Sequence, residues 1–285
     1  MATTRRWRAS NWSRSRPDSA GSGPLTVFED ENPQPAAPSG PLARVRLTIA
    51  YHGGGFRGMA AQPGQRTVAG VLEEALEKVL QAPVELAVAG RTDAGVHAWG
   101  QVVAFAAPAG VDPPGLLHRL NRLLAPEVVV REATAAPDGF DPRRAATGRR
   151  YRYTVLHRTL PDPWLADTAW WVPGPLDLRT MRAGCDPLLG EHDFSSFCRK
   201  QGDASLVREV REAEWLDLDD GVLRFEIEAS SFCQQMVRSI VGTLVDAGLG
   251  RRTAADVAAA VRARNRSTAG PVAPPHGLCL WEVTY

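Results

Sequence analysis

One order of predicted secondary-structure elements occurs twice in this chain, and it limits the possible folds more than any other feature. The segment RVRLTIAY alternates between apolar and polar residues, which is typical of a β-strand. The segment TVAGVLEEALEKVLQ has apolar residues three and four positions apart, which is typical of an amphipathic helix. The same criteria, applied along the chain, predict the order β-α-β-β-α-β at 44–51, 67–81, 84–89, 101–107, 114–126 and 127–135.

The second half of the chain repeats this order of elements without repeating the sequence. Strands are predicted at 149–157, 206–218, 222–230 and 277–285, and helices at 176–190, 234–249 and 254–264. The run Asp219–Asp220–Gly221 predicts a turn between two of these strands. We therefore predict an α+β fold with α/β layers, in which two ferredoxin-like βαββαβ halves lie side by side, each with its own sheet, around a central cleft.

Residues 1–42 differ from the rest of the chain. Five arginines precede the first acidic residue, Asp18, and stretches rich in Ser, Gly and Pro follow. Such a segment has too few apolar residues to form a core, so we predict a disordered, basic and Pro-rich tail. The two folded halves are expected at 43–140 and 141–285.

The composition excludes several classes of protein and leaves others open. The sequence contains no run of about 18 apolar residues that could span a membrane, and no apolar segment of a secretory signal. Its four cysteines form no CxxC pair and no zinc-type spacing with histidine. These features predict a cytoplasmic protein with free thiols, no metal site and no cofactor.

The basic residues are almost all arginine, whereas the net charge of the chain is close to zero. The net charge of +1 does not by itself indicate a nucleic-acid partner. Lys78 and Lys200 are the only lysines, so 31 of the 33 basic residues are arginine. Arginine suits contact with phosphates and stacking on bases, but a GC-rich genome produces the same bias, and composition leaves both explanations open.

The segment GRTDAGVH contains the best candidate for a catalytic residue. Asp93 lies in this glycine-rich loop between two apolar segments, so its carboxylate is expected to be partly buried and to need a cationic partner. A single carboxylate in such a place suits nucleophilic chemistry better than a two-carboxylate glycoside hydrolysis. His97 follows four residues later, and a hydrolase that uses Asp93 with His97 is one alternative. The other is that His97 caps the turn, since no serine or cysteine nucleophile accompanies it.

A second group of candidates follows in DPRRAATGRRYRY. Basic residues interleaved with tyrosines suit contact with RNA phosphates and stacking on bases. On a strand, Tyr151 and Tyr153 would share one face and Arg150 and Arg152 the other. The predicted RNA-binding residues are Arg143, Arg144, Arg149, Arg150 and Arg152.

Arg238 lies on an apolar helix face in the segment MVRSIVG. An arginine in such a place either extends its head group to solvent or pairs with an acidic residue from elsewhere. Asp93 is a candidate partner that sequence spacing alone does not identify.

Several of these segments together resemble a known family. GRTDAGVHA followed by GQVVAF resembles the signature of the tRNA pseudouridine synthase A family. GRRYRY, MVRSIVG and AGPVAPPHGLCLWEV resemble later segments of the same family and follow in the same order. The resemblance covers about residues 44–285.

The resemblance implies a pseudouridine synthase-type fold and a homodimer that holds tRNA across a basic surface. It implies that uridines in the anticodon stem-loop, at conventional tRNA positions 38–40, are converted to pseudouridine without a metal or cofactor. Asp93 would be the catalytic aspartate and Arg238 its partner. Whether Asp93 attacks C1′ or the base, or deprotonates C2′, stays open. The implied substrate-binding residues are Tyr151, which would stack on the target base, Arg91, which would help extrude the uridine, and Leu278, which would pack against the base.

The chain departs from the family pattern in one early segment, YHGGGFRGMAAQ. His52 stands where the family usually has aspartate, and Met59 where it has tryptophan. Because this loop is expected to help position RNA, the differences bear on substrate choice or affinity, and we interpret them as drift within an active enzyme. They also motivate the alternative function, a non-catalytic protein that binds tRNA and assists its folding.

Overall fold

The computed structural model describes residues 41–199, 202 and 204–285. These residues belong to one unit of the chain, which begins at Pro35. The predicted tail therefore lies outside the described residues except for its last two positions. Of these two, Leu42 already belongs to the first strand.

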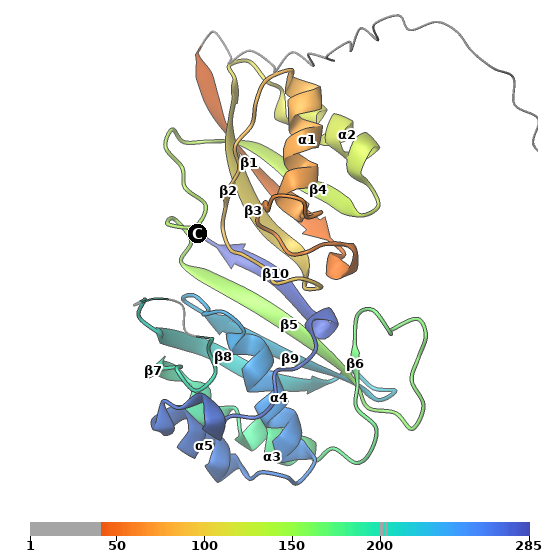
Figure 1. Cartoon of the computed structure of the whole chain (residues 1–285), viewed down its shortest axis with the longest axis vertical. Helices are drawn as coiled ribbons and strands as arrows, with labels where there is room; N and C mark the ends of the chain where they lie inside the picture. The colour runs from red at the N-terminus through yellow and green to blue at the C-terminus, as the bar shows by residue number, and fades with distance from the viewer. Residues whose placement is uncertain (1–40, 200–201, 203) are drawn as a thin grey trace, which may run out of the picture. The chain divides into compact units, whose positions relative to one another are not determined.

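The first half of the chain has the predicted order of elements (Figure 1). Its elements are β1 (Leu42–Tyr51), α1 (Val68–Leu80), β2 (Ala87–Val88), β3 (His97–Pro108), α2 (Pro113–Leu124) and β4 (Val128–Ala136). Thr67 caps α1 by accepting a hydrogen bond from the Gly70 amide at 3.2 Å, and Asp112 caps α2 in the same way.

Strand β2 is much shorter than the six residues predicted for it at 84–89. The reason lies in the preceding helix. The amides of Val84 and Leu86 donate to the carboxylates of Glu77 and Glu73, both at 3.3 Å. Because these donors are already bonded to side chains of α1, they are not available to a neighbouring strand.

The second half repeats the order, with additions. Its elements are β5 (Gly148–Leu156), β6 (Trp170–Trp171), α3 (Leu178–Ala183), β7 (Gly190–Asp193), β8 (Val207–Asp217), β9 (Val222–Ala229), α4 (Met236–Gly248), α5 (Ala254–Ala263) and β10 (Leu278–Thr284). The helix predicted at 176–190 is shorter than expected. A short 3-10 turn at Asp186–Leu188, which contains Pro187, follows it, and then β7 begins. Strands β6 and β7 are too short for their alternation to be recognised in the sequence.

The two halves share one sheet, whereas the sequence analysis predicted two sheets side by side. The strand order is β4-β1-β3-β10-β5-β9-β8-β7, with β2 paired to β3 and β6 paired to β5. Within it, β4-β1-β3-β2 and β10-β5-β9-β8 are both the ferredoxin-like order, which confirms the predicted fold class. The halves join because the last strand, β10, pairs in parallel with the start of β3, where Cys279 is opposite His97.

All five helices pack on one face of this sheet. Helices α1 and α2 lie against the strands of the first half, and α3, α4 and α5 against those of the second (Figure 1). Buried residues of neighbouring strands point to this face, since Leu280 is opposite Tyr151 and Tyr151 is opposite Ile227. The other face, called the open face below, carries Arg150, Arg152 and the glutamates opposite them.

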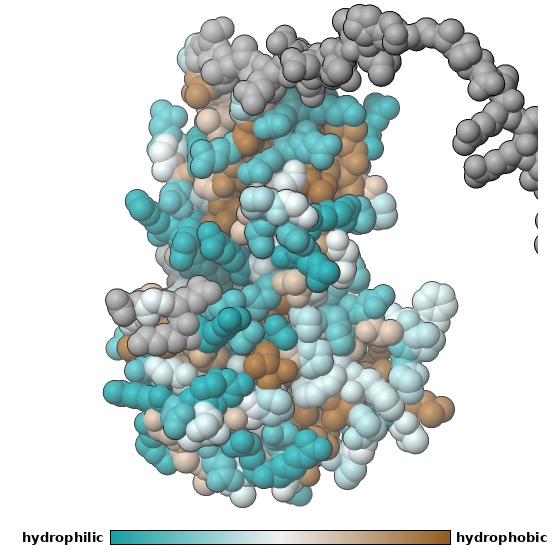
Figure 2. Space-filling model, viewed as in Figure 1, coloured by the Kyte–Doolittle hydropathy of each residue, from teal (hydrophilic) through white to brown (hydrophobic). Residues whose placement is uncertain are grey.

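No helix among the described residues is long and apolar enough to cross a membrane. Hydrophilic residues predominate on the surface between the regions of α1 and α4 (Figure 2).

Candidate active site

A large cleft opens on the helix-bearing face where the two halves meet. It is a cavity of about 960 Å³. Its walls come from the segments at 57–62, 87–96, 141–149 and 230–235, and from the first turn of α4. Tyr151 of β5 and Leu278 of β10 also line it, so the strands that join the two halves form part of the cleft. The cleft is thus lined by segments from both halves of the chain.

The loop that carries Asp93 is held by hydrogen bonds along its length. Gln101 donates to the Gly90 carbonyl at 2.8 Å, and the Met59 amide donates to the Thr92 carbonyl at 3.1 Å. The hydroxyl groups of Thr92 and Tyr51 are hydrogen-bonded at 2.7 Å. Burial raises the pKa of Tyr51 to about 12, so this tyrosine stays neutral at physiological pH. The loop is therefore a fixed platform that presents the Asp93 side chain to the cleft.

Two glycines allow this loop to pass close to its neighbours. Gly95 has φ +79°, a conformation that favours glycine, and a Cβ atom there would lie 3.0 Å from Pro275 Cγ. A Cβ atom on Gly53 would lie 2.1 Å from the Val96 carbonyl oxygen. Any side chain at Gly53 would therefore displace the end of the loop.

Arg238 and Asp93 come together in the cleft. Arg238 Nη1 lies 3.5 Å from Asp93 Oδ2, and the two side chains are 14% and 33% exposed. The Nε of Arg238 donates to the Ala273 carbonyl at 2.7 Å, and the Ala273 amide donates back to the Arg238 carbonyl at 3.0 Å. These bonds hold the guanidinium in place, so that it reaches the carboxylate from the first turn of α4.

Tyr151 and Leu278 lie beside this pair as buried residues. Tyr151 is 8% exposed, and the ring of Phe232 contacts it edge-on with centroids 5.0 Å apart. Burial raises the pKa of Tyr151 far above its ordinary value. A neutral aromatic ring fixed in this way offers a surface on which a planar base could stack.

His97 is held by the backbone on both sides of its ring. Its Nδ1 accepts a hydrogen bond from the Gly53 amide at 3.0 Å, which leaves the Nε2 proton to donate to the His276 carbonyl at 2.9 Å. Burial, followed by the nearby His52 ring, lowers the pKa of His97. A histidine whose two nitrogens are both used in this way has no free position for acid–base chemistry with Asp93. The geometry favours the capping role over the hydrolase alternative.

The predicted basic residues lie in four different settings. Arg91 and Arg143 line the cleft with exposed side chains, and among the described residues neither guanidinium has a bonding partner. Arg144 is also exposed but pairs with Asp141 at 3.6 Å and does not line the cleft. Arg149 lines the cleft and is 9% exposed.

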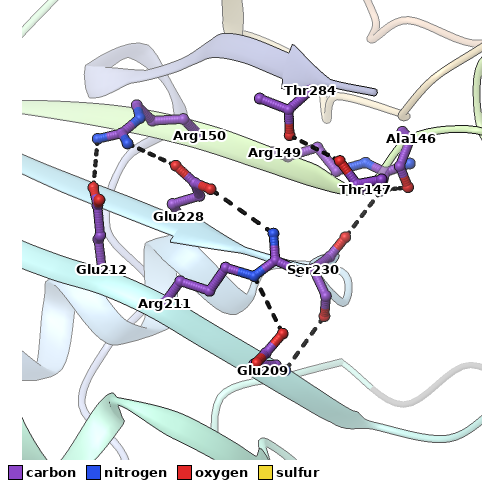
Figure 3. Close-up of polar contacts among 10 residues, drawn as sticks. All are labelled: Ala146, Thr147, Arg149, Arg150, Glu209, Arg211, Glu212, Glu228, Ser230 and Thr284. Atoms are coloured by element: carbon purple, nitrogen blue, oxygen red, sulfur yellow. Dashed lines mark hydrogen bonds and ion pairs between the residues drawn. The ribbon is translucent and has the colours of Figure 1, made fainter.

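Arg150 and Arg152 lie on the open face. Arg150 contacts Glu212 at 2.7 Å and Glu228 at 2.6 Å, and Arg152 contacts Glu226 at 2.9 Å. Figure 3 shows Arg150 directed toward Glu212 and Glu228, while Arg149 is directed toward Ala146 and Ser230. The structure therefore does not bring Arg150 and Arg152 to the cleft, and their contact with RNA stays a prediction.

Known proteins with similar sequences cover nearly the whole described chain. A protein of Myxococcus xanthus named tRNA pseudouridine synthase A is 42% identical over 245 residues, which cover 86% of this chain and 92% of that protein. Its counterpart from Frankia casuarinae is 44% identical over 247 residues, which cover 86% and 90%. The chain belongs to the tRNA pseudouridine synthase A family.

Two further similarities accompany these relatives. Residues 185–285 match the profile of the family described as tRNA pseudouridine synthase. The crystal structure of the archaeal box H/ACA sRNP Nop10-Cbf5 complex matches with a TM-score of 0.33 and 13% identity, over 79% of this chain and 60% of that chain. As a member of the tRNA pseudouridine synthase A family, the chain is an enzyme of the isomerase class.

The two departures from the family pattern lie in different environments. The Met59 side chain is fully buried, so a change of residue there alters core packing next to the Asp93 loop. His52 is exposed, and its ring lies 4.4 Å from that of His97. Neither side chain takes part in the ion pair of Asp93 and Arg238, which is present despite both changes.

Several residues that line the cleft were missed in the sequence analysis, among them Arg57, Arg208 and Phe232. Phe232 precedes the helix of Arg238 in SSFCQQMVR, and an aromatic residue so close to a candidate site was a usable signal. Arg57 and Arg208 lie in a loop and at the start of a strand, and nothing in their local sequence indicates that both reach one cleft. Among the described residues no group of three or more His, Cys, Asp or Glu side chains is arranged to hold a metal ion.

Proposed function

We propose that this protein converts uridine to pseudouridine in tRNA, with Asp93 as the reacting carboxylate. The observation that carries the proposal is the pair of Asp93 and Arg238, 3.5 Å apart, in a cleft that also holds the buried ring of Tyr151. A paired carboxylate stays available as a nucleophile, and the aromatic ring beside it suits a flipped base.

The reaction needs little beyond these residues. The bond between C1′ and N1 of the uridine breaks, the uracil turns, and a bond between C1′ and C5 forms. C5 loses its proton and N1 gains one, so the atoms balance without an external group or a redox partner. Asp93 acts as the nucleophile, Arg238 holds its carboxylate in position, and Tyr151 and Leu278 confine the base while it turns.

The proposed substrate is the anticodon stem-loop of tRNA, with uridines at positions 38–40 as targets. Six arginines and only two carboxylates line the cleft, so its charge suits a nucleic-acid backbone. Arg91 and Arg143 lack a carboxylate partner among the described residues and are the ones we assign to phosphate contact. The protein would act as a homodimer in the cytoplasm, as the family resemblance implies.

The test is to incubate the purified protein with an unmodified tRNA transcript that bears uridines in the anticodon arm. Pseudouridine is then mapped by carbodiimide-dependent stops of reverse transcription. We expect new stops at positions 38–40 with the wild type and none with Asp93→Asn, since the amide is not a nucleophile. Asp186→Asn is the matched control, because Asp186 is an exposed aspartate on the 3-10 turn after α3 and outside the cleft.

Normal turnover by a folded Asp93→Asn protein would contradict the role of Asp93. Stops outside the anticodon arm would contradict the proposed target positions. Binding of tRNA without any stops would favour the non-catalytic tRNA-binding protein, and His52→Asp and Met59→Trp would then be the variants to examine.

A further inference from the structure

Arg149 is the most fully engaged basic side chain of the cleft. It lies on β5, two residues before Tyr151 and on the same face, and only 9% of it is exposed. Its Nη2 donates to the carbonyls of Ala89 at 3.1 Å and Arg143 at 3.0 Å. Its Nη1 donates to the carbonyls of Ser230 at 3.0 Å and Ala146 at 3.4 Å. All four Nη hydrogens therefore have a backbone acceptor.

The four acceptors belong to three separate walls of the cleft. Ala89 directly precedes the loop that carries Asp93. Ser230 directly follows β9 and begins the segment that leads into α4 and Arg238. The other two carbonyls belong to the loop at 141–147 before β5. One guanidinium thus connects the backbone on the Asp93 side of the cleft with the backbone on the Arg238 side.

No carboxylate of the described residues lies within ion-pair distance of Arg149, unlike its neighbour Arg150. Burial lowers the pKa of Arg149, although an arginine remains protonated at any physiological pH. A buried cation without a counter-ion is costly, and here carbonyl dipoles alone compensate for its lost hydration. Lysine cannot replace it, because one ammonium has three donors at a single point and cannot reach carbonyls on opposite sides.

We propose that Arg149 is a positioning residue, which clamps the Asp93 loop and the segment before α4 at the separation that the pair of Asp93 and Arg238 requires. Its task is the geometry of the catalytic pair, and it is not a phosphate contact, as its place in the basic segment suggested. A ligand phosphate would find no Nη hydrogen of Arg149 free. The kinetic test of this inference rests on the proposed function, whereas its structural test does not.

The structural test is hydrogen exchange on the free protein. We expect Arg149→Lys to raise exchange by about tenfold or more in peptides that cover 90–96 and 231–235, since both segments lose a shared anchor. Peptides from α1 and from α5 should be unchanged. Arg252→Lys is the matched control, because Arg252 is a half-buried arginine that also donates to a backbone carbonyl, that of Thr268 at 2.6 Å, outside the cleft.

The kinetic test separates a clamp from a phosphate contact. For Arg149→Lys and Arg149→Gln we expect kcat to fall by about 30-fold or more, while KM and the Kd for tRNA change by less than about threefold. The dependence of Kd on salt should stay as in the wild type. A phosphate contact predicts the reverse, with weaker binding, an unchanged kcat and a salt slope reduced by about 1.

Each outcome decides the inference. Unchanged exchange in both peptides, or the binding pattern of a phosphate contact, would overturn it. Failure of both Arg149 variants to fold would also overturn it, because a clamp confined to the cleft is not needed for the sheet. If the wild type forms no pseudouridine, the proposed function fails while hydrogen exchange still decides whether Arg149 is a clamp.

Discussion

The two faces of strand β5 carry the same kinds of residue in opposite electrostatic settings. On the cleft side, six arginines from several segments line the cleft, and Asp93 and Asp141 are the only carboxylates among its lining residues. On the open face, Arg150 and Arg152 are surrounded by Glu212, Glu226 and Glu228 at 2.6–3.7 Å. The cleft has more arginines than carboxylates, whereas the arginines of the open face are paired with glutamates of the same chain.

The difference shows that the role of an arginine depends more on its bonding partners than on its place in a basic segment. Arg149 and Arg150 are adjacent, yet one donates to carbonyls that wall the cleft and the other pairs with glutamates of β8 and β9. Ion-paired arginines on the open face stabilise the sheet and have less charge to offer to phosphates. Three predictions test this contrast, beginning with the largest expected effect.

Arg238→Gln should lower kcat/KM by about 100-fold, the size expected when about 3 kcal/mol of a half-buried charge pair is lost. The variant should remain folded, and the rate of pseudouridine formation at tRNA concentrations well below KM is the measurement. Arg182→Gln is the matched control, because Arg182 also donates its Nε to a backbone carbonyl, that of Trp215 at 3.0 Å, outside the cleft. Equal losses in the two variants would mean that the pairing with Asp93 has no special role.

Glu226→Gln should have the opposite effect to Arg238→Gln, because it should lower the stability of the protein and change its activity little. Glu226 is 6% exposed and lies within 3.7 Å of three arginines, Arg150, Arg152 and Arg224. Removing its charge leaves these arginines less compensated, and we expect the free energy of unfolding in urea to fall by about 1–3 kcal/mol. Glu132→Gln, which breaks the exposed pair with Arg46, should cost less than about 0.5 kcal/mol. A loss of activity in folded Glu226→Gln would contradict the view that the ion pairs of the open face serve stability alone.

The smallest effect concerns pH and His97. Its pKa is lowered in the folded protein, chiefly by burial, so the unfolded chain takes up a proton at a higher pH than the folded chain does. Its contribution to stability is therefore present above about pH 6.5 and is lost as the pH falls below that value.

We expect the stability difference between wild type and His97→Asn to shrink by about 1 kcal/mol between pH 7.5 and 5.5, measured by urea unfolding. His118→Asn, at an exposed site on α2, should show no such change. A pH-independent difference for His97→Asn would mean that the bond from Gly53 to Nδ1 does not restrict protonation.

Much of the fold could be predicted because its signals are local. The apolar spacing of α1, its Thr67 cap and the alternation in β5 each depend on neighbouring residues only. The predicted turn is present, with positive φ at Asp219, Asp220 and Gly221. The shortness of strand β2 could not be predicted, because the side chains of Glu73 and Glu77 on α1 accept hydrogen bonds from the amides of Val84 and Leu86 just before it, a contact made only after folding.

The candidate site was predictable in part for the same reason. GRTDAGVH and MVRSIVG identify Asp93 and Arg238 because each motif is short and continuous. Their distance of 3.5 Å was not predictable, since 145 positions separate them in the chain and the pairing of β10 with β3 brings the halves together. Periodicity correctly separated Tyr151 from Arg150, since alternate residues of a strand point to opposite faces.

The amino-acid sequence by itself determined the repeated order of elements, the family and the candidate site residues, because these depend on local pattern and on motif. Only the tertiary structure decided that the two halves share one sheet, that His97 is bound through both nitrogens, and that Arg149 holds two walls of the cleft. The physical reason is that a hydrogen bond or an ion pair depends on distance in space. In these cases the partners come from strands and loops that the fold, and not the chain order, places side by side.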